Sequence, residues 1–293
     1  PEYPILFESY CQQMEQHLAK RGWLDEAFVY WFDEPLPKDY DYVMNGFAKL
    51  KAAAPKITRM LTVMKGVEEP LYGGPQIWCA ISNRYEHDIA QARRKYGEKF
   101  WWYICTGPKA PYCTLFIDHP GTELRAWLWQ TWQRNIEGIL VWQSNYWTSD
   151  TAYPDHPQNP YADPMGWRVG YGTPRGEKRP WGNGDGRFIY PPEEAACADP
   201  AGPVLAGPVD SQRWEMLRDG IEDYEYLSIL KTLIGKHETQ LTASQRQDYS
   251  ALMEVPADIS SDMTHFTQDP APIEVQRHRV AQAIVALKRL ERD

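Results

Sequence analysis

The chain has 293 residues and a formal net charge of −9, with 43% hydrophobic and 24% charged residues, which are ordinary values for a globular protein. Because the chain is acidic and lacks a basic stripe that could neutralise phosphates, its charge argues against a nucleic-acid partner. No run of 18 apolar residues occurs, so we expect no membrane partner and no membrane-spanning helix.

Strands and helices are expected to alternate through the first half of the chain. Runs of β-branched and aromatic residues predict strands, and apolar residues at helical spacing predict helices. The expected strands are 27–32, 56–63, 76–81, 100–105 and 138–142, and the expected helices are 5–20, 39–53, 84–96 and 121–136. Such alternation is typical of a parallel sheet with right-handed crossovers, and therefore of an α/β fold.

The expected architecture is a (β/α)8 barrel of the TIM type. No strand is followed by a Gly-rich phosphate loop, which argues against a doubly wound nucleotide-binding sheet. Residues 182–186 resemble such a loop, but they precede a short strand at 187–190 and not a helix. A complete barrel has eight strands, whereas only five are found before residue 146. We therefore expect part of a barrel, in a sequence truncated at its N-terminus.

The second half is expected to hold a long loop region and then helices. Residues 146–207 are rich in Gly, Pro, Asn, Asp and aromatic residues, and a loop of this length is usually functional. Beyond residue 208 the pattern predicts helices at about 210–235, 243–254 and 270–292. The expected domains are residues 1–207, the carboxyl-terminal portion of a catalytic barrel with its active-site loop, and residues 208–293, a helical region packed on the barrel.

Neither a disulfide framework nor a metal site is predicted. The five cysteines show no CxxC spacing and the seven histidines show no metal-ligand spacing, so we expect no metal and no cofactor. Cys79 and Cys105 lie in apolar strand-like runs and are expected to be buried thiols.

Aromatic residues are unusually frequent, with 13 Trp and 18 Tyr. Many lie in Gly/Pro-rich segments, where exposed flat rings suit stacking against the apolar faces of sugars. Packing in an ordinary core is the alternative interpretation, because large rings also bury much apolar surface.

Two adjacent acids, Asp33 and Glu34, follow the aromatic run 28–32 and precede Pro35. Proline cannot donate to a strand ladder and disfavours helix before it, so the strand should end near Glu34. Parallel α/β enzymes place catalytic groups at such strand ends. Two neighbouring carboxyl groups in an aromatic setting favour different protonation states, which is the division of roles that glycoside hydrolysis needs. A solvated acidic turn is the alternative.

Four stretches of the sequence, in the expected order, resemble the catalytic region of glycoside hydrolase family 123 and the related bacterial domains of unknown function. The ordered set is specific, whereas the acid pair alone would be weak. The four stretches are Trp31–Pro35, Phe116–Pro120, Gly138–Trp147, and Gly184–Pro191 continuing to Arg213–Glu225.

The resemblance implies a barrel whose fourth strand ends in the catalytic pair, so that the five strands found here are the fourth to the eighth. Members of this type usually carry a β-sandwich and the first three strands upstream. A missing N-terminal segment, a second chain or a second copy of this chain is therefore expected to complete the barrel.

The resemblance also implies an enzyme that cleaves a terminal β-linked N-acetylhexosamine, typically N-acetylgalactosamine, by substrate-assisted retaining catalysis. The acetamido oxygen of the sugar acts as the nucleophile. Glu34 is then the general acid, and Asp33 accepts a hydrogen bond from the acetamido N–H. Adjacent residues of a regular strand point to opposite faces, so both acids can converge only if the strand distorts there.

Residues at or beyond strand ends are the candidates for substrate binding: Tyr103, Trp142, Asn145, Tyr146, Trp147 and Asp185. Tyr103 could instead be core, and Asp185, flanked by glycines, could instead cap its loop. Arg213, Arg218 and Asp219 are expected to form an ion-pair network that holds the last helix under the barrel.

Asp118 is expected to be an N-cap residue of the helix at 121–136. Two alternative functions stay open: a carbohydrate-binding protein that no longer turns over, and a glycosidase of related fold that acts on another sugar.

Overall fold

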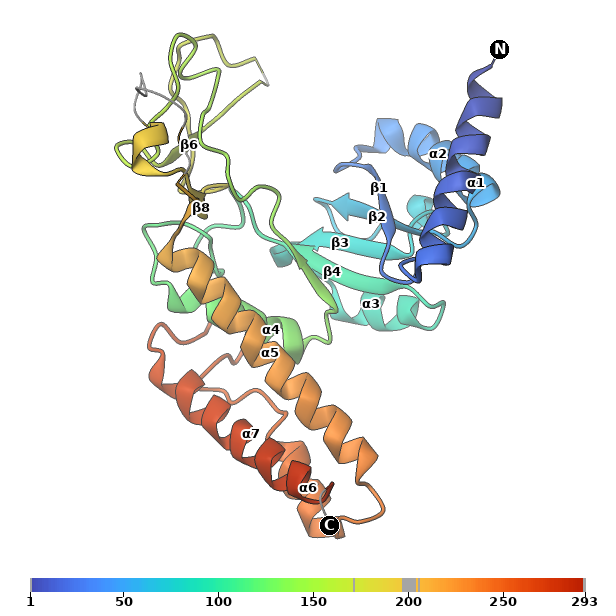
Figure 1. Ribbon diagram of the computed structural model, residues 1–293, viewed down its shortest axis with the longest axis vertical. Helices are drawn as coiled ribbons and strands as arrows, with labels where there is room; N and C mark the ends of the chain where they lie inside the picture. Colours follow the sequence, from blue (N-terminus) through green and yellow to red (C-terminus); the bar gives the residue numbers. More distant parts are fainter. Residues whose placement is uncertain (1, 171, 197–203, 205, 292–293) are drawn as a thin grey trace. The chain divides into compact units, whose positions relative to one another are not determined.

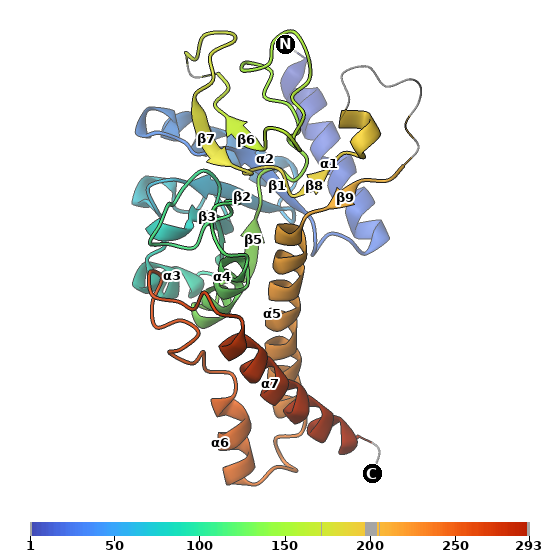
Figure 2. The same cartoon turned by 90° about the vertical axis from the view of Figure 1, so that its left-hand side faces the viewer.

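The computed structural model describes residues 2–170, 172–196, 204 and 206–291, and Figures 1 and 2 show its ribbon from two sides. These residues belong to two compact units. The sheet unit comprises Pro1–Tyr103 and Ile136–Leu140, and the helical unit comprises Ile104–Asn135 and Val141–Asp293. The boundary expected between residues 207 and 208 stays a prediction, and Cys197 lies outside the described residues.

The sheet unit contains five parallel strands in the order β1-β2-β3-β4-β5, as the alternation of strands and helices predicts. The sheet is curled like half of a barrel (Figure 1). The strands are β1 (Phe28–Phe32), β2 (Thr58–Val63), β3 (Ile77–Ile81), β4 (Lys99–Tyr103) and β5 (Gly138–Leu140). Strand β4 ends two residues earlier than expected, so Cys105 lies outside it and is half-buried, and the prediction of a buried thiol there is wrong. Cys79, within β3, is fully buried as expected.

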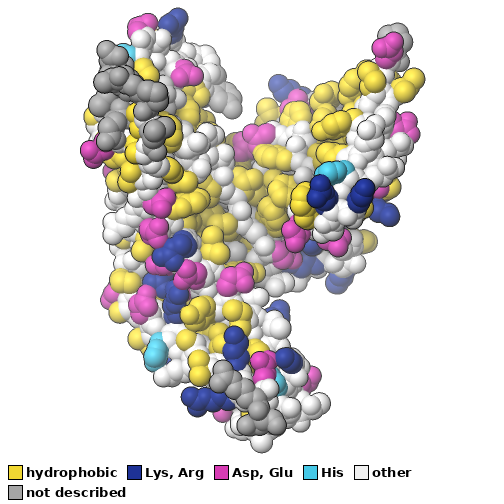
Figure 3. Space-filling model, viewed as in Figure 1, with side chains coloured by type: hydrophobic (Ala, Val, Ile, Leu, Met, Phe, Trp, Pro, Cys, Tyr) yellow, Lys and Arg dark blue, Asp and Glu magenta, His cyan; other side chains and the backbone are white. Residues whose placement is uncertain are grey.

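One face of this sheet packs against helices. The helices are α1 (Tyr3–Arg21), α2 (Tyr40–Ala53) and α3 (His87–Arg94). Side chains alternate between the two faces along each strand, so Leu61, Trp78 and Phe100 lie on the same face. There they pack in one hydrophobic core with residues of α1 and α2. Helix α1 ends at Gly22, whose φ of 73° suits a residue without Cβ. Hydrophobic side chains also gather on the outer surface of α1 (Figure 3), where Tyr3, Ile5, Leu6 and Tyr10 are exposed.

The opposite, inner face of the sheet carries a different set of side chains. The register aligns Thr62 with Cys79 and Cys79 with Trp101, and it aligns Tyr30 with Met60. The Trp101 ring lies so close over Gly138 that a Cβ there would stand 2.5 Å from the indole. This inner face is the surface on which the acid pair stands.

The helical unit contains α4 (Thr122–Gln133), α5 (Gln212–Lys236), α6 (Ala243–Ala251) and α7 (Ala271–Arg289). Its core consists of apolar residues from α4, α5 and α7, among them Trp129, Leu230 and Val280. Ser211 caps the start of α5, because its hydroxyl accepts a hydrogen bond from the backbone N–H of Trp214 at 3.2 Å. The region 146–207 is not loop alone. It contributes the antiparallel pair of β6 (Met165–Trp167) with β7 (Pro180–Asn183), and also β8 (Ile189–Tyr190), which pairs with β9 (Val209–Asp210) just beyond the region.

Two expectations for polar residues of the helical unit are wrong. Helix α4 begins after Gly121, so Asp118 does not cap it and instead accepts a hydrogen bond from the Asn183 amide at 2.9 Å. Arg213 is buried and donates to the backbone carbonyls of Leu115, Gly184 and Arg187. The expected ion-pair network therefore does not include Arg213.

The expected contact between Arg218 and Asp219 is present, at 3.1 Å on the exposed face of α5. The buried network of this unit has other members. Asp223, which is 1% exposed, accepts from Arg125, Arg277 and the indole of Trp129.

Candidate active site

The acid pair stands on a distorted backbone at the carboxyl end of β1. The register between β1 and β2 shifts between Tyr30 and Phe32, which marks a bulge. Glu34 has a φ of 47°, in the left-handed region that residues other than glycine seldom adopt. This is the distortion that convergence of the two acids requires, and their contacts show both carboxyl groups on the inner face.

Asp33 is held by two hydroxyl groups through one of its two oxygens. The hydroxyl of Thr62 donates to Oδ1 at 2.7 Å, and the phenol of Tyr30 donates to the same oxygen. Burial, together with the hydrogen bond to Asp33, raises the pKa of Tyr30 well above its usual value, so the phenol stays a donor at neutral pH. Among the described residues, no group donates to Oδ2 of Asp33, which leaves that oxygen free to accept a hydrogen bond from a ligand.

Glu34 has a different environment. The phenol of Tyr103 donates to its Oε1, and its backbone N–H donates to the hydroxyl of Thr62 at 3.0 Å. Burial raises the pKa of Glu34 and the charge of Asp33 adds to this effect, while the hydrogen bond from Tyr103 opposes it. A carboxyl group with a raised pKa retains its proton more readily, as a general acid must.

Two aromatic rings also meet on the inner face of the sheet, toward the amino ends of its strands. Phe28 and Trp101 meet edge to face, with ring centroids 5.2 Å apart. The ring of Tyr103 is buried in the core, as the alternative interpretation of this residue expected. Its hydroxyl nevertheless donates a hydrogen bond to Glu34.

A second group of expected residues lies in the helical unit. The Trp142 indole donates to Oδ2 of Asp185 at 3.0 Å, and the rings of Trp142 and Tyr146 lie 5.5 Å apart. Asp185 is 1% exposed, between Gly184 and Gly186 whose φ angles of 78° and 74° need residues without Cβ. Burial raises the pKa of Asp185 to about 6. Trp142 keeps an exposed ring.

The remaining two expected residues have structural contacts in the same loop region. The Trp147 indole donates to the carbonyl of Ile189 at 2.7 Å, and Asn145 forms an isolated bridge with Arg187. Arg187 is fully buried, with its guanidinium over the Tyr146 ring.

The structure thus brings the expected residues together in two sets: Asp33, Glu34 and Tyr103 in the sheet unit, and Trp142, Asn145, Tyr146, Trp147 and Asp185 in the helical unit. The sequence analysis missed Tyr30 and Thr62. A signal for Thr62 was present, because neighbouring parallel strands end at the same edge of a sheet and Thr62 stands near the end of the strand that follows the acid pair.

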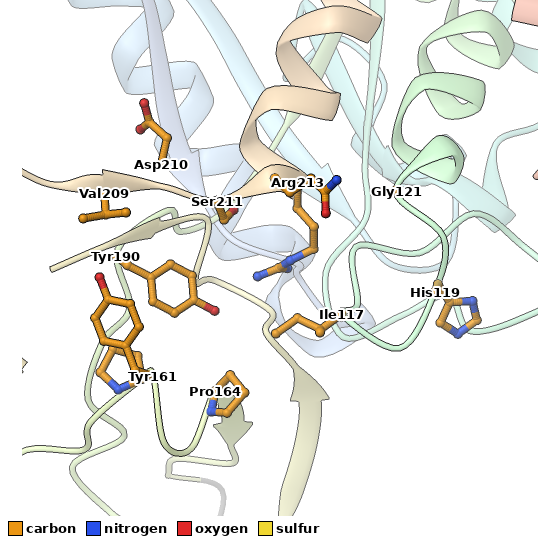
Figure 4. A pocket seen from close by; sticks show the side chains of 12 residues that line it. Ile117, His119, Gly121, Tyr161, Pro164, Tyr190, Val209, Asp210, Ser211 and Arg213 are labelled. Atoms are coloured by element: carbon orange, nitrogen blue, oxygen red, sulfur yellow. The ribbon is translucent and has the colours of Figure 1, made fainter. Parts of the chain in front are cut away.

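A separate cavity of about 440 Å³ lies within the helical unit. Figure 4 shows the rings of Tyr161 and Tyr190 side by side there, near Pro164 and Ile117 and below the start of α5. None of the residues expected to bind substrate lines this cavity.

Two further observations concern ligands and membranes. In the part of the chain that the structure describes, no group of three or more His, Cys, Asp or Glu side chains could hold a metal ion. Over the same residues, no helix is both long and apolar enough to cross a membrane.

A curled parallel sheet with two neighbouring carboxyl groups at the end of a strand is compatible with one class of enzymes in particular, the glycoside hydrolases. The model for the catalytic domain of glycoside hydrolase 123 matches residues 1–230, and the chain belongs to this family, as the four sequence stretches indicated.

A similar solved structure is that of a family 123 glycoside hydrolase from Clostridium perfringens, analysed for the details of glycolipid glycan hydrolysis. The two chains share 14% sequence identity and a TM-score of 0.56, over 99% of this chain and 45% of the other. This likeness supports the fold, and the chain spans less than half the length of that structure. No curated protein matches the chain.

Proposed function

We propose that Asp33 and Glu34 are the catalytic pair of a retaining glycosidase that removes a terminal β-linked N-acetylhexosamine, with N-acetylgalactosamine as the preferred sugar. The observation that carries this proposal is the unequal environment of the two carboxyl groups. Asp33 binds two hydroxyl donors through Oδ1 and keeps Oδ2 free, whereas burial favours a proton on Glu34. Family membership supports cleavage of a glycoside.

The chemistry takes place in two steps, and the enzyme supplies no nucleophile. In the first step the acetamido oxygen of the sugar attacks the anomeric carbon while Glu34 gives its proton to the leaving oxygen. The bond to the leaving group breaks, and a cyclic oxazoline-type intermediate forms. Asp33 accepts the acetamido N–H through Oδ2 and stabilises the positive charge that develops there. In the second step Glu34 takes a proton from water while the water oxygen attacks the anomeric carbon. The bond from that carbon to the acetamido oxygen breaks, and the released sugar keeps its original anomeric configuration.

Aromatic residues of the helical unit are further evidence that the substrate is a carbohydrate. The exposed Trp142 ring, with Tyr146 beside it, offers a flat surface to the apolar face of a sugar. Asp185 is too buried to meet a sugar directly, so we assign it the role of holding the Trp142 indole. Direct contacts from Tyr103, Asn145 and Trp147 stay predictions.

We also propose that further strands cover the edge of the sheet at β1. Strand β1 stands at one end of the strand order, and its inner-face residues Phe28 and Tyr30 are 40% and 42% exposed. An open edge with exposed rings favours association, and the strands can come from the same polypeptide, a second chain or a second copy. Light scattering of the purified chain tests this idea, and a stable, well-packed monomer would contradict it.

A panel of aryl β-glycosides tests the proposed activity. Turnover is measured on the N-acetylgalactosaminide, the N-acetylglucosaminide and the galactoside, and nuclear magnetic resonance identifies the first-formed anomer. We expect hydrolysis of the acetamido sugars with retention, no measurable hydrolysis of the galactoside, and tight binding of a thiazoline that mimics the intermediate. Efficient cleavage of the galactoside would favour the second alternative, a glycosidase with another substrate. Sugar binding without turnover would favour a carbohydrate-binding protein.

A further inference from the structure

We infer that Thr62 is the residue that positions both acids at once, through its single hydroxyl group. This inference rests on the proposed function. Thr62 is 2% exposed and lies on β2, beside the strand that carries the acids. Its Oγ1 donates to Oδ1 of Asp33 at 2.7 Å and accepts the backbone N–H of Glu34 at 3.0 Å. The hydroxyl therefore lies between the two acids and joins them.

The hydrogen-bonding capacity of a hydroxyl fits this arrangement. A threonine hydroxyl has one proton and two acceptor lone pairs. The proton goes to Asp33, because a carboxylate oxygen only accepts, and a lone pair receives the amide proton of Glu34. The phenol of Tyr30 approaches the same hydroxyl to 2.9 Å and also donates to Oδ1 of Asp33. The result is a directed chain from the Glu34 amide through Thr62 to Asp33, in which each bond polarises the next.

This chain explains how the strained backbone is held. A residue other than glycine with φ near 47° persists only where its surroundings hold it. The hydrogen bond from the backbone N–H of Glu34 to the Thr62 hydroxyl directly restrains the peptide group of Glu34. It links the end of β1 to β2. Loss of this tie should release Glu34 from its conformation and, at the same time, remove one donor from Asp33. Thr62 is buried and hydrogen-bonded to the acids, so it acts through them.

Two substitutions at this position separate the roles of its atoms. Thr62→Val keeps the branched shape but has no hydroxyl, whereas Thr62→Ser keeps the hydroxyl and loses a methyl group. Because small displacements of catalytic groups can lower rates by about 10²-fold, we expect Thr62→Val to lower kcat on an aryl N-acetylgalactosaminide by about 10²-fold. KM should change much less, and the affinity for the thiazoline should fall in parallel with kcat/KM. Thr62→Ser should restore most of the activity.

Tyr30→Phe is the matched control, because it removes a donor from Asp33 but leaves the tie to Glu34 intact. It should weaken thiazoline binding, yet it should leave the dependence of the rate on the leaving group as in the wild type. Thr62→Val should change both properties. A purely structural role would lower the folded fraction without altering the thiazoline affinity or the leaving-group dependence of the folded protein.

A crystal structure of the Thr62→Val protein gives a readout that does not depend on activity. We expect Glu34 to leave the left-handed region and its contact with Tyr103 to change. An unchanged acid pair in that structure would overturn the inference, as would equal losses in the Val and Ser variants. If the wild type neither cleaves the acetamido substrates nor binds the thiazoline, the proposed function fails, and the crystal structure still decides whether Thr62 positions the pair.

Discussion

The phenol of Tyr103, on β4, donates a hydrogen bond to Oε1 of Glu34, at the end of β1. Strands β2 and β3 lie between them in the sheet order. In a flat sheet, β1 and β4 would lie about 14 Å apart, because neighbouring strands are spaced by about 4.8 Å. A direct contact between the two side chains therefore requires the curl of the sheet. The curl turns the inner face into a concave surface on which residues from distant strands meet.

Tyr103→Phe should move the pH dependence of the reaction. The hydrogen bond from Tyr103 lowers the pKa of Glu34 and thus opposes the effect of burial. Its removal should raise that pKa further, so that Glu34 retains its proton to higher pH. We expect the alkaline limb of the kcat/KM profile to shift toward higher pH. A shift toward lower pH would contradict the assignment of Glu34 as the acid.

Glu34→Gln keeps the shape of the side chain but cannot donate a proton. We expect a loss of about 10²–10⁴ in rate on substrates with poor leaving groups. The loss should be smaller with nitrophenyl leaving groups, which need little protonation. Rates on a series of aryl glycosides check this prediction, and equal losses across the series would remove Glu34 from the acid role.

Asp33→Asn keeps the geometry but removes the negative charge opposite the developing positive charge. Hydrogen bonds to an ionised group are about twice as strong as neutral ones, so we expect kcat to fall by about 10²–10³. Thiazoline affinity should fall as well. A 2-deoxy-2-fluoro sugar should label no carboxylate, as mass spectrometry of the treated protein can show. A covalent adduct on Asp33 or Glu34 would refute the substrate-assisted mechanism.

Asp185→Asn should change how stability depends on pH. The folded-state pKa of Asp185, about 6, lies above its ordinary value of 3.8. Its contribution to stability is therefore fully present below about pH 4 and is lost as the pH rises through 6. The shift of about two units corresponds to about 3 kcal/mol.

Asparagine can still accept the Trp142 indole but does not titrate. The free energy of unfolding of the wild type, minus that of Asp185→Asn, should therefore fall between pH 4 and 7. Urea denaturation at several pH values measures this difference in the free energy of unfolding. Titratable groups that both proteins share contribute little to it, because their effects cancel. A flat difference across this pH range would show that Asp185 is not a perturbed buried acid.

Asp223→Ala should destabilise the helical unit strongly, because it leaves the buried Arg125 without its main partner. Removing one member of a buried ion pair costs about 3–5 kcal/mol. Glu274 still contacts Arg125, so the loss should lie near the lower value. The control is Arg218→Ala, whose ion pairs on α5 are exposed to solvent and should contribute little to stability. Urea denaturation compares the two variants, and similar losses in both would contradict this account of the network.

The order of the elements along the chain could be predicted from the sequence. Hydrophobic periodicity and chain breakers are local signals, since they depend on neighbours a few residues away. They predicted a strand at 27–32, which the structure has at Phe28–Phe32, and the end of the first helix at Gly22, and the five parallel strands are confirmed. The family was also evident from the sequence, because its motifs are short and occur in order. Local signals located the ends of elements less well, as Asp118 and Cys105 show.

The tertiary structure alone decided which side chains meet. Thr62 and Asp33 are 29 residues apart, and Arg125 and Asp223 are 98 residues apart. Strand order, register and the curl of the sheet determine contacts at such separations, and these properties arise from packing of the whole unit. The sequence by itself therefore determined that two acids end the first strand. The folded sheet decided that Tyr30 and Thr62 hold Asp33 and that Tyr103 binds Glu34, because only the bulge and the curl bring these groups within hydrogen-bonding distance.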